Sequence, residues 1–368
     1  IDLGKGILLP GFINAHVHLE LGWIQNRIGN FNGFIAWLEQ IIKAKSEDIK
    51  REVIELSIQI GIKTLISNGV TTVAEISSFG GIDIPLLKKS GLRTILFSEL
   101  FDRLEDFRET LSFEKQELFE ERPFPHAPYS CSPALLKNVL GFYRQRNIPM
   151  GIHLAESQEE VKFLKGIENG FEKKIFPLID KENFSRVKAN SPYQYLRKLK
   201  FFKGTKVTAV HMVQVRPEEV EELKKSDIGV VLCPRSNYFL KVGSPPIKHY
   251  YKLDRIGIGT DGLSSNMNLD FFEELRFFYH ISSNVLRENA PLFTIYVATL
   301  GGARSLFLEN KIGSIEKGKD ADLIFIKPKN TYSDPYMSVI SSSNSELKMS
   351  MVKGKVIYSK FRVPRIFQ

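Results

Sequence analysis

Histidine is scarce in this chain, and most of its histidines fall at comparable places in the sequence. Of seven histidines, five come at or just after the end of an apolar segment typical of a β-strand, and an aspartate ends another such segment. Side chains two residues apart on a strand point to the same face, so His16 and His18 can bind one metal ion together. The six residues of this predicted site are His16, His18, His126, His153, His211 and Asp261.

The apolar segments that carry these residues alternate with stretches of helical periodicity. Eight strand candidates over roughly 250 residues, most of them separated by helical segments, predict a TIM (β/α)8 barrel. Strands buried on both faces read as continuous apolar runs, which fits a parallel sheet. Barrel active sites lie at the C-terminal ends of the strands, where the six residues fall. A doubly wound open sheet is the alternative, but no glycine-rich phosphate loop follows the first strand.

The two ends of the chain differ in character from the barrel. We predict a strand of a small β domain over residues 1–9, the barrel over residues 10–305, and the rest of that domain, a small β-sandwich appendage, over residues 306–368. Between the strands we expect a helix that begins at Ser46, because an N-cap serine is followed there by two acids. We also expect a charged helix over residues 104–120 and an irregular surface excursion over residues 166–192.

The residue types at the strand ends suit a mononuclear metal centre. A catalytic Zn²⁺ takes three or four nitrogen and oxygen ligands and keeps one position for water, whose pKa it lowers to about 7. The predicted ligands are His16, His18, His153 and Asp261. His211 is placed to support the site, and Glu156, three residues after His153, is the candidate general acid and base. We expect one Zn²⁺ per chain, with Fe²⁺ as the alternative.

The composition is that of an ordinary globular protein. The chain has 368 residues, 43% hydrophobic and 25% charged, and no apolar run approaches the roughly 20 residues that span a bilayer. The net charge of +9 comes from Lys and Arg interleaved with acids, which argues against a nucleic-acid surface. Two distant cysteines, Cys131 and Cys233, favour a cytoplasmic setting. We expect a small-molecule enzyme without nucleic-acid or membrane partners, and leave a homodimer open.

Together these motifs strongly resemble the amidohydrolase superfamily. The matching segments are residues 10–18, 153–157, 210–211, 259–262 and 313–323, so the resemblance runs nearly from end to end. It implies a (β/α)8 barrel with a small β-sandwich built from both chain ends. Binuclear members carry a carboxylated lysine on strand four. Here that segment reads Arg122-Pro123-Phe124-Pro125-His126, so the resemblance implies one metal ion.

Further segments are similar to the deaminase and chlorohydrolase branch of that superfamily. They are residues 126–132 and 233–237. In that branch the residue matching His126 contacts substrate, the one matching Glu156 shuttles protons, and the one matching His211 steadies the hydrolytic water. Residues 18–20, 34–38 and 259–266 look like the aminodeoxyfutalosine deaminases of menaquinone biosynthesis.

The residues that would contact substrate form a second group of predictions. Glu20, Trp37 and Ser264 are candidates to line the substrate pocket beside His126. The arginines that bind substrate in the S-adenosylhomocysteine deaminases have no clear match here, and Arg103 and Arg235 are the candidates for that role.

The predicted activity is hydrolytic deamination of a 6-aminopurine nucleoside-like substrate to its 6-oxo product and ammonia. We expect 6-aminodeoxyfutalosine as the substrate, with Glu156 carrying the proton to the ammonia and with His211 and Asp261 stabilising the tetrahedral intermediate. Methylthioadenosine, S-adenosylhomocysteine or adenosine is the alternative substrate, and hydrolysis of an s-triazine-type ring is the alternative reaction. A non-catalytic scaffold is the third alternative, against which the complete set of predicted ligands argues.

Overall fold

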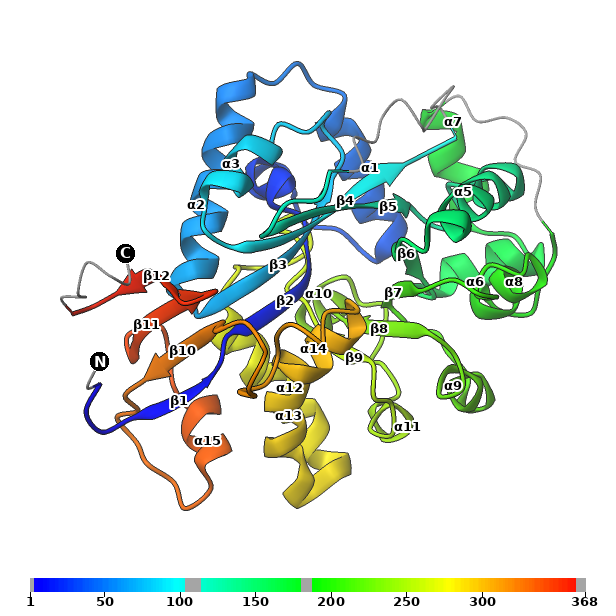
Figure 1. Cartoon of the computed structure of the whole chain (residues 1–368). Coiled ribbons are helices and arrows are strands. Elements are labelled where there is room, and N and C mark those ends of the chain that lie inside the picture. The colour runs from blue at the N-terminus through cyan, green and yellow to red at the C-terminus, as the bar shows by residue number, and fades with distance from the viewer. Residues whose placement is uncertain (1–2, 103–113, 180–186, 362–368) are drawn as a thin grey trace.

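A computed structural model describes residues 3–102, 114–179 and 187–361. Eight parallel strands form two four-stranded sheets, and helices surround them (Figure 1). The eight strands that the sequence predicts are present. The first sheet contains, in order, β2 (Phe12–Val17), β3 (Val70–Ser77), β4 (Arg93–Leu100) and β5 (Phe119–Pro125). The second contains, in order, β6 (Met150–Leu154), β7 (Val207–His211), β8 (Ile228–Leu232) and β9 (Ile256–Ile258).

The two sheets meet at the C-terminal ends of their strands. His153 N donates a hydrogen bond of 2.9 Å to His126 O, next to β5, and Asp261 N donates one of 3.1 Å to His16 O of β2. The close contact between β2 and the segment after β9 requires Gly259, because a Cβ there would lie 2.5 Å from His16 O. No strand ladder joins the two sheets within the described part of the chain. These hydrogen bonds nonetheless bring the strand ends of both sheets around one centre.

Helices and helical turns connect the strands on the outside of the sheets. The connections of the first half are η1 (Leu19–Arg27), α1 (Phe34–Lys45), α2 (Arg51–Ser67), α3 (Ile84–Lys89) and α5 (Pro133–Arg146). Those between β6 and β9 are α6 (Gln158–Lys165), η2 (Phe171–Ile175), α7 (Phe176–Leu178), α8 (Pro192–Lys198), α9 (Pro217–Leu223), α10 (Pro234–Phe239) and α11 (Ile247–Tyr250). After β9 come α12 (Phe271–Leu286), η3 (Arg287–Asn289), α13 (Ala290–Ala298), α14 (Leu300–Ser305) and α15 (Pro335–Ile340).

The predicted helix start at Ser46 is wrong. Ser46 lies at the C-terminal end of α1, where its Oγ donates to Lys43 O at 2.8 Å, and α2 begins only at Arg51. The backbone of Ser46 is helical (φ −84°, ψ −8°) rather than extended, as an N-cap requires. The apolar periodicity before Ser46 therefore belongs to a separate helix, α1, which reaches the functional site.

The two other predicted connections also differ from the structure. The charged helix over residues 104–120 lies mostly outside the described residues, and the end of its range belongs to β5. The segment 166–192 is not merely a surface excursion, because η2 and α7 fall within it. Phe171 of η2 is fully buried, and its ring stacks on that of Tyr129 with 4.2 Å between centroids. This segment therefore packs against the strand ends.

The small sheet is antiparallel and contains both an N-terminal and several C-terminal strands. Its order is β1 (Ile7–Pro10), β10 (Leu323–Ile326), β11 (Leu347–Val352) and β12 (Lys355–Ser359), so it brings together the first and the last described strands (Figure 1). Arg93 at the start of β4 ties it to the barrel, because its guanidinium binds Asp322 and Asp320 at 2.8 Å each. The described residues form one four-stranded layer, so the two-layered sandwich and the domain boundaries stay predictions.

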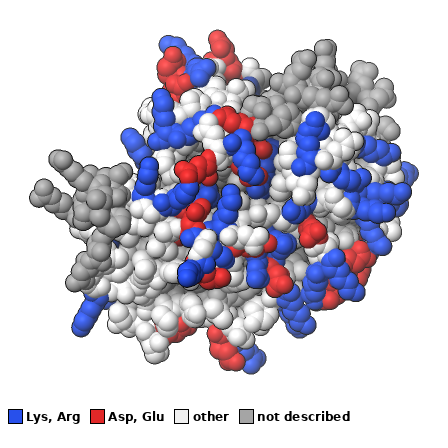
Figure 2. All heavy atoms as spheres, viewed as in Figure 1, with Lys and Arg blue, Asp and Glu red and all other residues white. Residues whose placement is uncertain are grey.

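The surface carries both signs of charge. Figure 2 shows Lys and Arg over much of one face, with Asp and Glu among them. Within the described residues no helix combines the length and the apolar character that crossing a membrane requires. The cytoplasmic setting, the absence of nucleic-acid partners and the homodimer stay predictions.

Candidate active site

Four predicted metal ligands converge where the two sheets meet. His16 Nε2 lies 3.4 Å from His153 Nε2 and 3.6 Å from Asp261 Oδ1, and His18 Nε2 lies 3.7 Å from the same Oδ1. With metal–ligand bonds of about 2.0–2.1 Å, the ligand atoms of a tetrahedral Zn²⁺ lie roughly 3.4 Å apart. The observed spacing therefore fits a single metal ion held by these side chains.

The electrostatic state of these side chains also suits a metal. Burial lowers the pKa of His18 and of His153 well below the ordinary histidine value, and neighbouring histidines lower it further. Burial alone would raise the pKa of Asp261, but its hydrogen bond to His16 and the surrounding histidines hold that pKa well below its ordinary value. Neutral imidazoles and an ionised carboxylate are the forms that bind Zn²⁺.

Strained backbone positions the residues at the strand ends. Ala155, His211, Met212 and Asp261 have φ values of 54°, 74°, 47° and 57°, in the left-handed region that non-glycine residues seldom occupy. All four lie at or just after the C-terminal ends of β6, β7 and β9. Such strain persists only where surrounding contacts enforce it, and it concentrates at functional sites. The sharp turns direct the side chains of the site toward the common centre.

Two neighbours from α10 hold the functional side chains in place, and the sequence prediction missed both. Ser236 Oγ donates to Asp261 Oδ2 at 2.6 Å, and Asn237 Oδ1 lies 3.2 Å from His211 Nδ1. They belong to the segment 233–237, whose resemblance to the deaminase branch was the available signal. Partners of this kind fix the orientation of metal ligands and the tautomer of a histidine.

Glu156 lies beside the predicted metal ligands, as its position after β6 predicts. Its Oε1 is 3.6 Å from His211 Nε2, and its backbone N donates to Glu160 Oε2 at 3.0 Å. Burial raises the pKa of Glu156 well above its ordinary value, and the negative charges of Asp261 and Glu160 add to the effect. Ser157 caps the following helix α6, so the turn that presents Glu156 is anchored on both sides. A raised pKa favours the protonated carboxyl group, which is the form that acts as a general acid.

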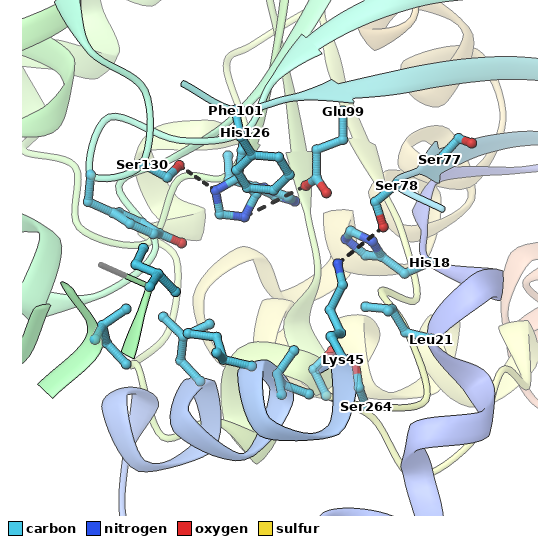
Figure 3. Close-up of a pocket in the computed structure, with 18 of the residues that line it drawn as sticks. His18, Leu21, Lys45, Ser77, Ser78, Glu99, Phe101, His126, Ser130 and Ser264 are labelled. Carbon is cyan, nitrogen blue, oxygen red and sulfur yellow. Dashed lines mark hydrogen bonds and ion pairs between the residues drawn. The ribbon is translucent and has the colours of Figure 1, made fainter. Parts of the chain in front are cut away.

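A cavity of about 980 Å³ opens above these residues. His126, Trp37 and Ser264 line it, as the sequence predicts, and Trp37 Nε1 donates to Ser264 O at 2.7 Å. Figure 3 shows His126 and Glu99 on the side of the strand ends, with Lys45 rising from α1 toward them. An apolar wall formed by two helical segments completes the cavity, and its residues are Trp37, Leu38, Ile41, Ile42, Ile175, Phe176, Leu178 and Ile179.

Of the other three predicted substrate-binding residues, two do not line the cavity and one lies outside the described residues. Glu20 does not line the cavity, because its fully buried carboxylate turns to the backbone N–H groups of Ser78 (2.7 Å) and Phe79 (3.1 Å). Arg235 also turns away, and its guanidinium binds Glu273 of α12 at 2.9 Å. Both residues brace the loops around the site, since the loop backbone and α12 offer them charged or hydrogen-bonding partners. Arg103 lies outside the described residues.

Buried carboxylates behind the first strand support the segment that carries the predicted metal ligand His18. Glu75 accepts hydrogen bonds of 2.9 and 3.1 Å from Leu19 N, directly after His18. Asp83 accepts one of 2.8 Å from Ser77 Oγ, and burial together with the charge of Glu20 raises the pKa of Asp83 to about 8. Burial likewise raises the pKa of Glu75 well above its ordinary value. These acids hold the loop after β3 against the segment that carries His18.

Comparisons with known proteins agree with this geometry. The model of the amidohydrolase family matches residues 7–357. The 5'-deoxyadenosine deaminase of Methanobrevibacter smithii is 31% identical over 361 residues, which cover 93% of this chain and 78% of that protein. The chain therefore belongs to the amidohydrolase family, as the motifs predicted, and this membership implies the TIM-barrel fold.

Two solved structures share the fold at lower identity. Helicobacter pylori aminofutalosine deaminase, in complex with methylthio-coformycin, has a TM-score of 0.82 and 24% identity, covering 96% of this chain and 87% of that one. An adenosine deaminase of Xanthomonas campestris with bound zinc has a TM-score of 0.80 and 24% identity, covering 95% of this chain and 80% of that one. At this level of identity the likeness shows the fold alone.

Proposed function

We propose that this protein is a hydrolytic deaminase of 6-aminopurine nucleosides that uses one Zn²⁺ per chain. The observation that carries the proposal is the convergence of His16, His18, His153 and Asp261 beside Glu156, at the base of one large cavity. The deaminase activity named for the relative from Methanobrevibacter smithii supports it. When bound, the metal lowers the pKa of a water molecule and so supplies a nucleophile near neutral pH.

The side chains around the metal ligands move the protons. The Nδ1–H of His211 donates to Asn237 Oδ1, which leaves Nε2 free to accept a hydrogen bond from the hydrolytic water and to orient it. Glu156 lies 3.6 Å from that Nε2; it takes the two protons of the hydrolytic water in turn and passes one to the ring nitrogen beside C6 and one to the departing amino group. Asp261 stays ionised, held by Ser236, and balances positive charge at the centre. Ammonia and the 6-oxo purine are the products.

The shape of the cavity supports an extended substrate. Its volume of about 980 Å³ is at the upper end of the roughly 300–1,000 Å³ of small-molecule pockets. Its apolar wall suits a substituent on the sugar that carries no hydroxyl group. We therefore place 6-aminodeoxyfutalosine first among the substrates, in a menaquinone pathway, and methylthioadenosine, 5'-deoxyadenosine and S-adenosylhomocysteine after it.

A substrate panel tests this proposal. Zinc-loaded protein is incubated with those four compounds, with adenosine and with an aminated s-triazine, and ammonia release is measured. We expect turnover of the adenine compounds, with the highest kcat/KM for 6-aminodeoxyfutalosine. Turnover of the s-triazine alone would show that the protein is an s-triazine hydrolase, the alternative reaction, and not a nucleoside deaminase. Absence of turnover with every compound would overturn the proposed function.

The variant Glu156→Gln tests the role of the proton carrier. It preserves the shape of the side chain but removes its proton transfer, so we expect kcat to fall about 10²- to 10⁴-fold while the zinc content stays at one per chain. Glu159→Gln is the matched control, because Glu159 lies one turn further along the chain and pairs with Lys162 on the surface. Normal activity in Glu156→Gln would remove Glu156 from the mechanism.

A further inference from the structure

Glu99 is a buried carboxylate for which the mechanism has no use. It lies near the end of β4, lines the cavity, and its side chain is only 4% exposed. The ring of His126 lies beside it, with Nε2 3.7 Å from Glu99 Oε1. No hydrogen bond to this carboxylate is found within residues 3–102, 114–179 and 187–361. A buried carboxylate without hydrogen bonds is costly, so the arrangement points to a ligand that supplies them.

Lys45 faces Glu99 from the opposite side of the cavity. It extends from α1 toward the strand ends (Figure 3), with its Nζ 3.3 Å from Ser78 Oγ and 4.9 Å from the centre of the Phe79 ring. Among the described residues that line the cavity, it is the one Lys or Arg. An ammonium group only donates hydrogen bonds and an ionised carboxylate only accepts them. The pair therefore suits a ligand group that does both, which a hydroxyl does.

This polar pair lies next to the metal centre. Ring nitrogens of His126 and of the metal ligand His153 and a carboxylate oxygen of Glu99 all lie within 4.8 Å of one another. A second metal ion on these three residues is the competing interpretation. Against it, His153 Nε2 already faces His16 Nε2 at 3.4 Å, so a second ion would keep only His126 and Glu99 as ligands, fewer than the three or four that Zn²⁺ takes. In a nucleoside the sugar is joined directly to the purine, so we expect the sugar to reach this position when the purine lies over the metal site.

We propose that Glu99 and Lys45 bind the 2'- and 3'-hydroxyl groups of a ribonucleoside and so make the enzyme selective for ribose over 2'-deoxyribose. The two carboxylate oxygens of Glu99 accept from the adjacent hydroxyls, while the ammonium group of Lys45 donates to one of them. This inference rests on the proposed function and names the class of sugar that the same site takes. The sequence prediction missed Glu99, although it lies near a strand end like the metal ligands.

The test compares matched pairs of nucleosides on zinc-loaded protein. We measure kcat/KM for adenosine against 2'-deoxyadenosine, and for 5'-deoxyadenosine against 2',5'-dideoxyadenosine. The wild type should prefer the ribose compounds about 10- to 100-fold, the usual effect of losing hydrogen bonds to a charged group. Glu99→Gln should lose most of that preference through a higher KM for the ribose compounds. Lys45→Met should reduce the preference to a smaller extent.

A neighbouring carboxylate serves as the control. Glu121 lines the same cavity, but it already accepts a 2.6 Å hydrogen bond from Ser98 Oγ, so Glu121→Gln should keep the preference for ribose. Equal kcat/KM values for ribose and 2'-deoxyribose compounds in the wild type would overturn the inference while leaving the deaminase intact. An unchanged preference for ribose in Glu99→Gln would also overturn the inference. So would a zinc content of two ions per chain in the wild type that falls to one in Glu99→Gln.

A binding measurement separates this inference from the proposed function. If no adenine compound is turned over, the proposed function fails. Calorimetric titration of zinc-loaded protein with inosine and with 2'-deoxyinosine then decides the sugar site by itself. Inosine that binds about 10-fold or more tightly than 2'-deoxyinosine, with a difference that Glu99→Gln abolishes, would support the site. Equal affinities, or no binding of either compound, would overturn it.

Discussion

The base of the cavity and its outer wall are built in different ways. At the base, the functional side chains project from strand ends and are almost fully buried, and neighbours orient two of them, Ser236 for Asp261 and Asn237 for His211. The outer wall comes from α1, η2 and α7, and its apolar side chains include Leu178, which is 43% exposed. Hydrogen-bonded strands define positions sharply, whereas connecting segments vary more freely.

This difference separates chemistry from selectivity. The base holds the predicted metal ligands and Glu156, which any substrate of the proposed reaction would need. Under the proposed function, the wall, together with Glu99 and Lys45, would contact the parts of a substrate that do not react. Changes at the base should therefore alter kcat and metal binding, and changes in the wall should alter KM for particular substrates. Four experiments test this division.

Removal of the metal should have the largest effect. Dialysis against a chelator is expected to abolish ammonia release, and one equivalent of Zn²⁺ should restore it. At a zinc concentration 1,000 times its Kd, removal should also lower the free energy of unfolding by about 4 kcal/mol, because the ion binds only the folded chain. Elemental analysis and thermal unfolding are the measurements. Full activity in protein shown to be metal-free would contradict the assignment of a metal site to the base of the cavity.

Ser236→Ala should have the next largest effect. It removes the 2.6 Å hydrogen bond to Asp261 Oδ2 and leaves Oδ1, which faces His16 and His18, unchanged. Loss of such a partner costs about 10- to 100-fold in metal affinity or activity. Zinc affinity is measured by competition with a chelating dye, and Ser283→Ala, on the exposed side of α12, is the control. A change in KM without a change in zinc affinity would place Ser236 with the wall.

Leu178→Ser should act on selectivity alone. Leu178 lines the cavity but is 43% exposed, so the substitution should not disturb folding. Loss of an apolar contact worth roughly 1 kcal/mol should raise KM for methylthioadenosine about fivefold and leave kcat unchanged. Adenosine, which has a 5'-hydroxyl group, should be affected less. Leu292→Ser, at a residue of α13 that is 51% exposed and does not line the cavity, is the control.

Asp83→Asn should have the smallest effect and should change stability rather than catalysis. Burial and Glu20 raise the pKa of Asp83 to about 8, so the folded chain keeps a proton that the unfolded chain releases above its ordinary pKa. The free energy of unfolding therefore falls as pH rises toward about 8, and Asp83→Asn should make this fall shallower. Urea unfolding at several pH values measures it. An identical pH dependence in the variant would show that Asp83 does not titrate in this way.

The sequence alone was sufficient to predict which side chains meet at the base of the cavity. His16 and His18 share a strand face, and the ends of parallel strands meet at one edge, so strand periodicity and the barrel rule together predicted the ligand cluster. The same rule put Glu156 and His211 beside that cluster, where they lie 3.6 Å apart, and their catalytic roles stay predictions. Glu99 follows it as well, and was missed only because a carboxylate near a strand end is a weaker signal than a histidine.

Only the tertiary structure decided which other side chains face the cavity. Glu20 and Arg235 were both predicted to contact substrate, but each turns to a partner far away in the sequence, the loop at Ser78 or helix α12. The direction of a side chain after a strand end depends on such distant hydrogen-bond partners, because a buried charge must find one. Local periodicity carries no information about them. For the same reason the buried turn at Phe171 and the partners Ser236 and Asn237 became visible only in the folded chain.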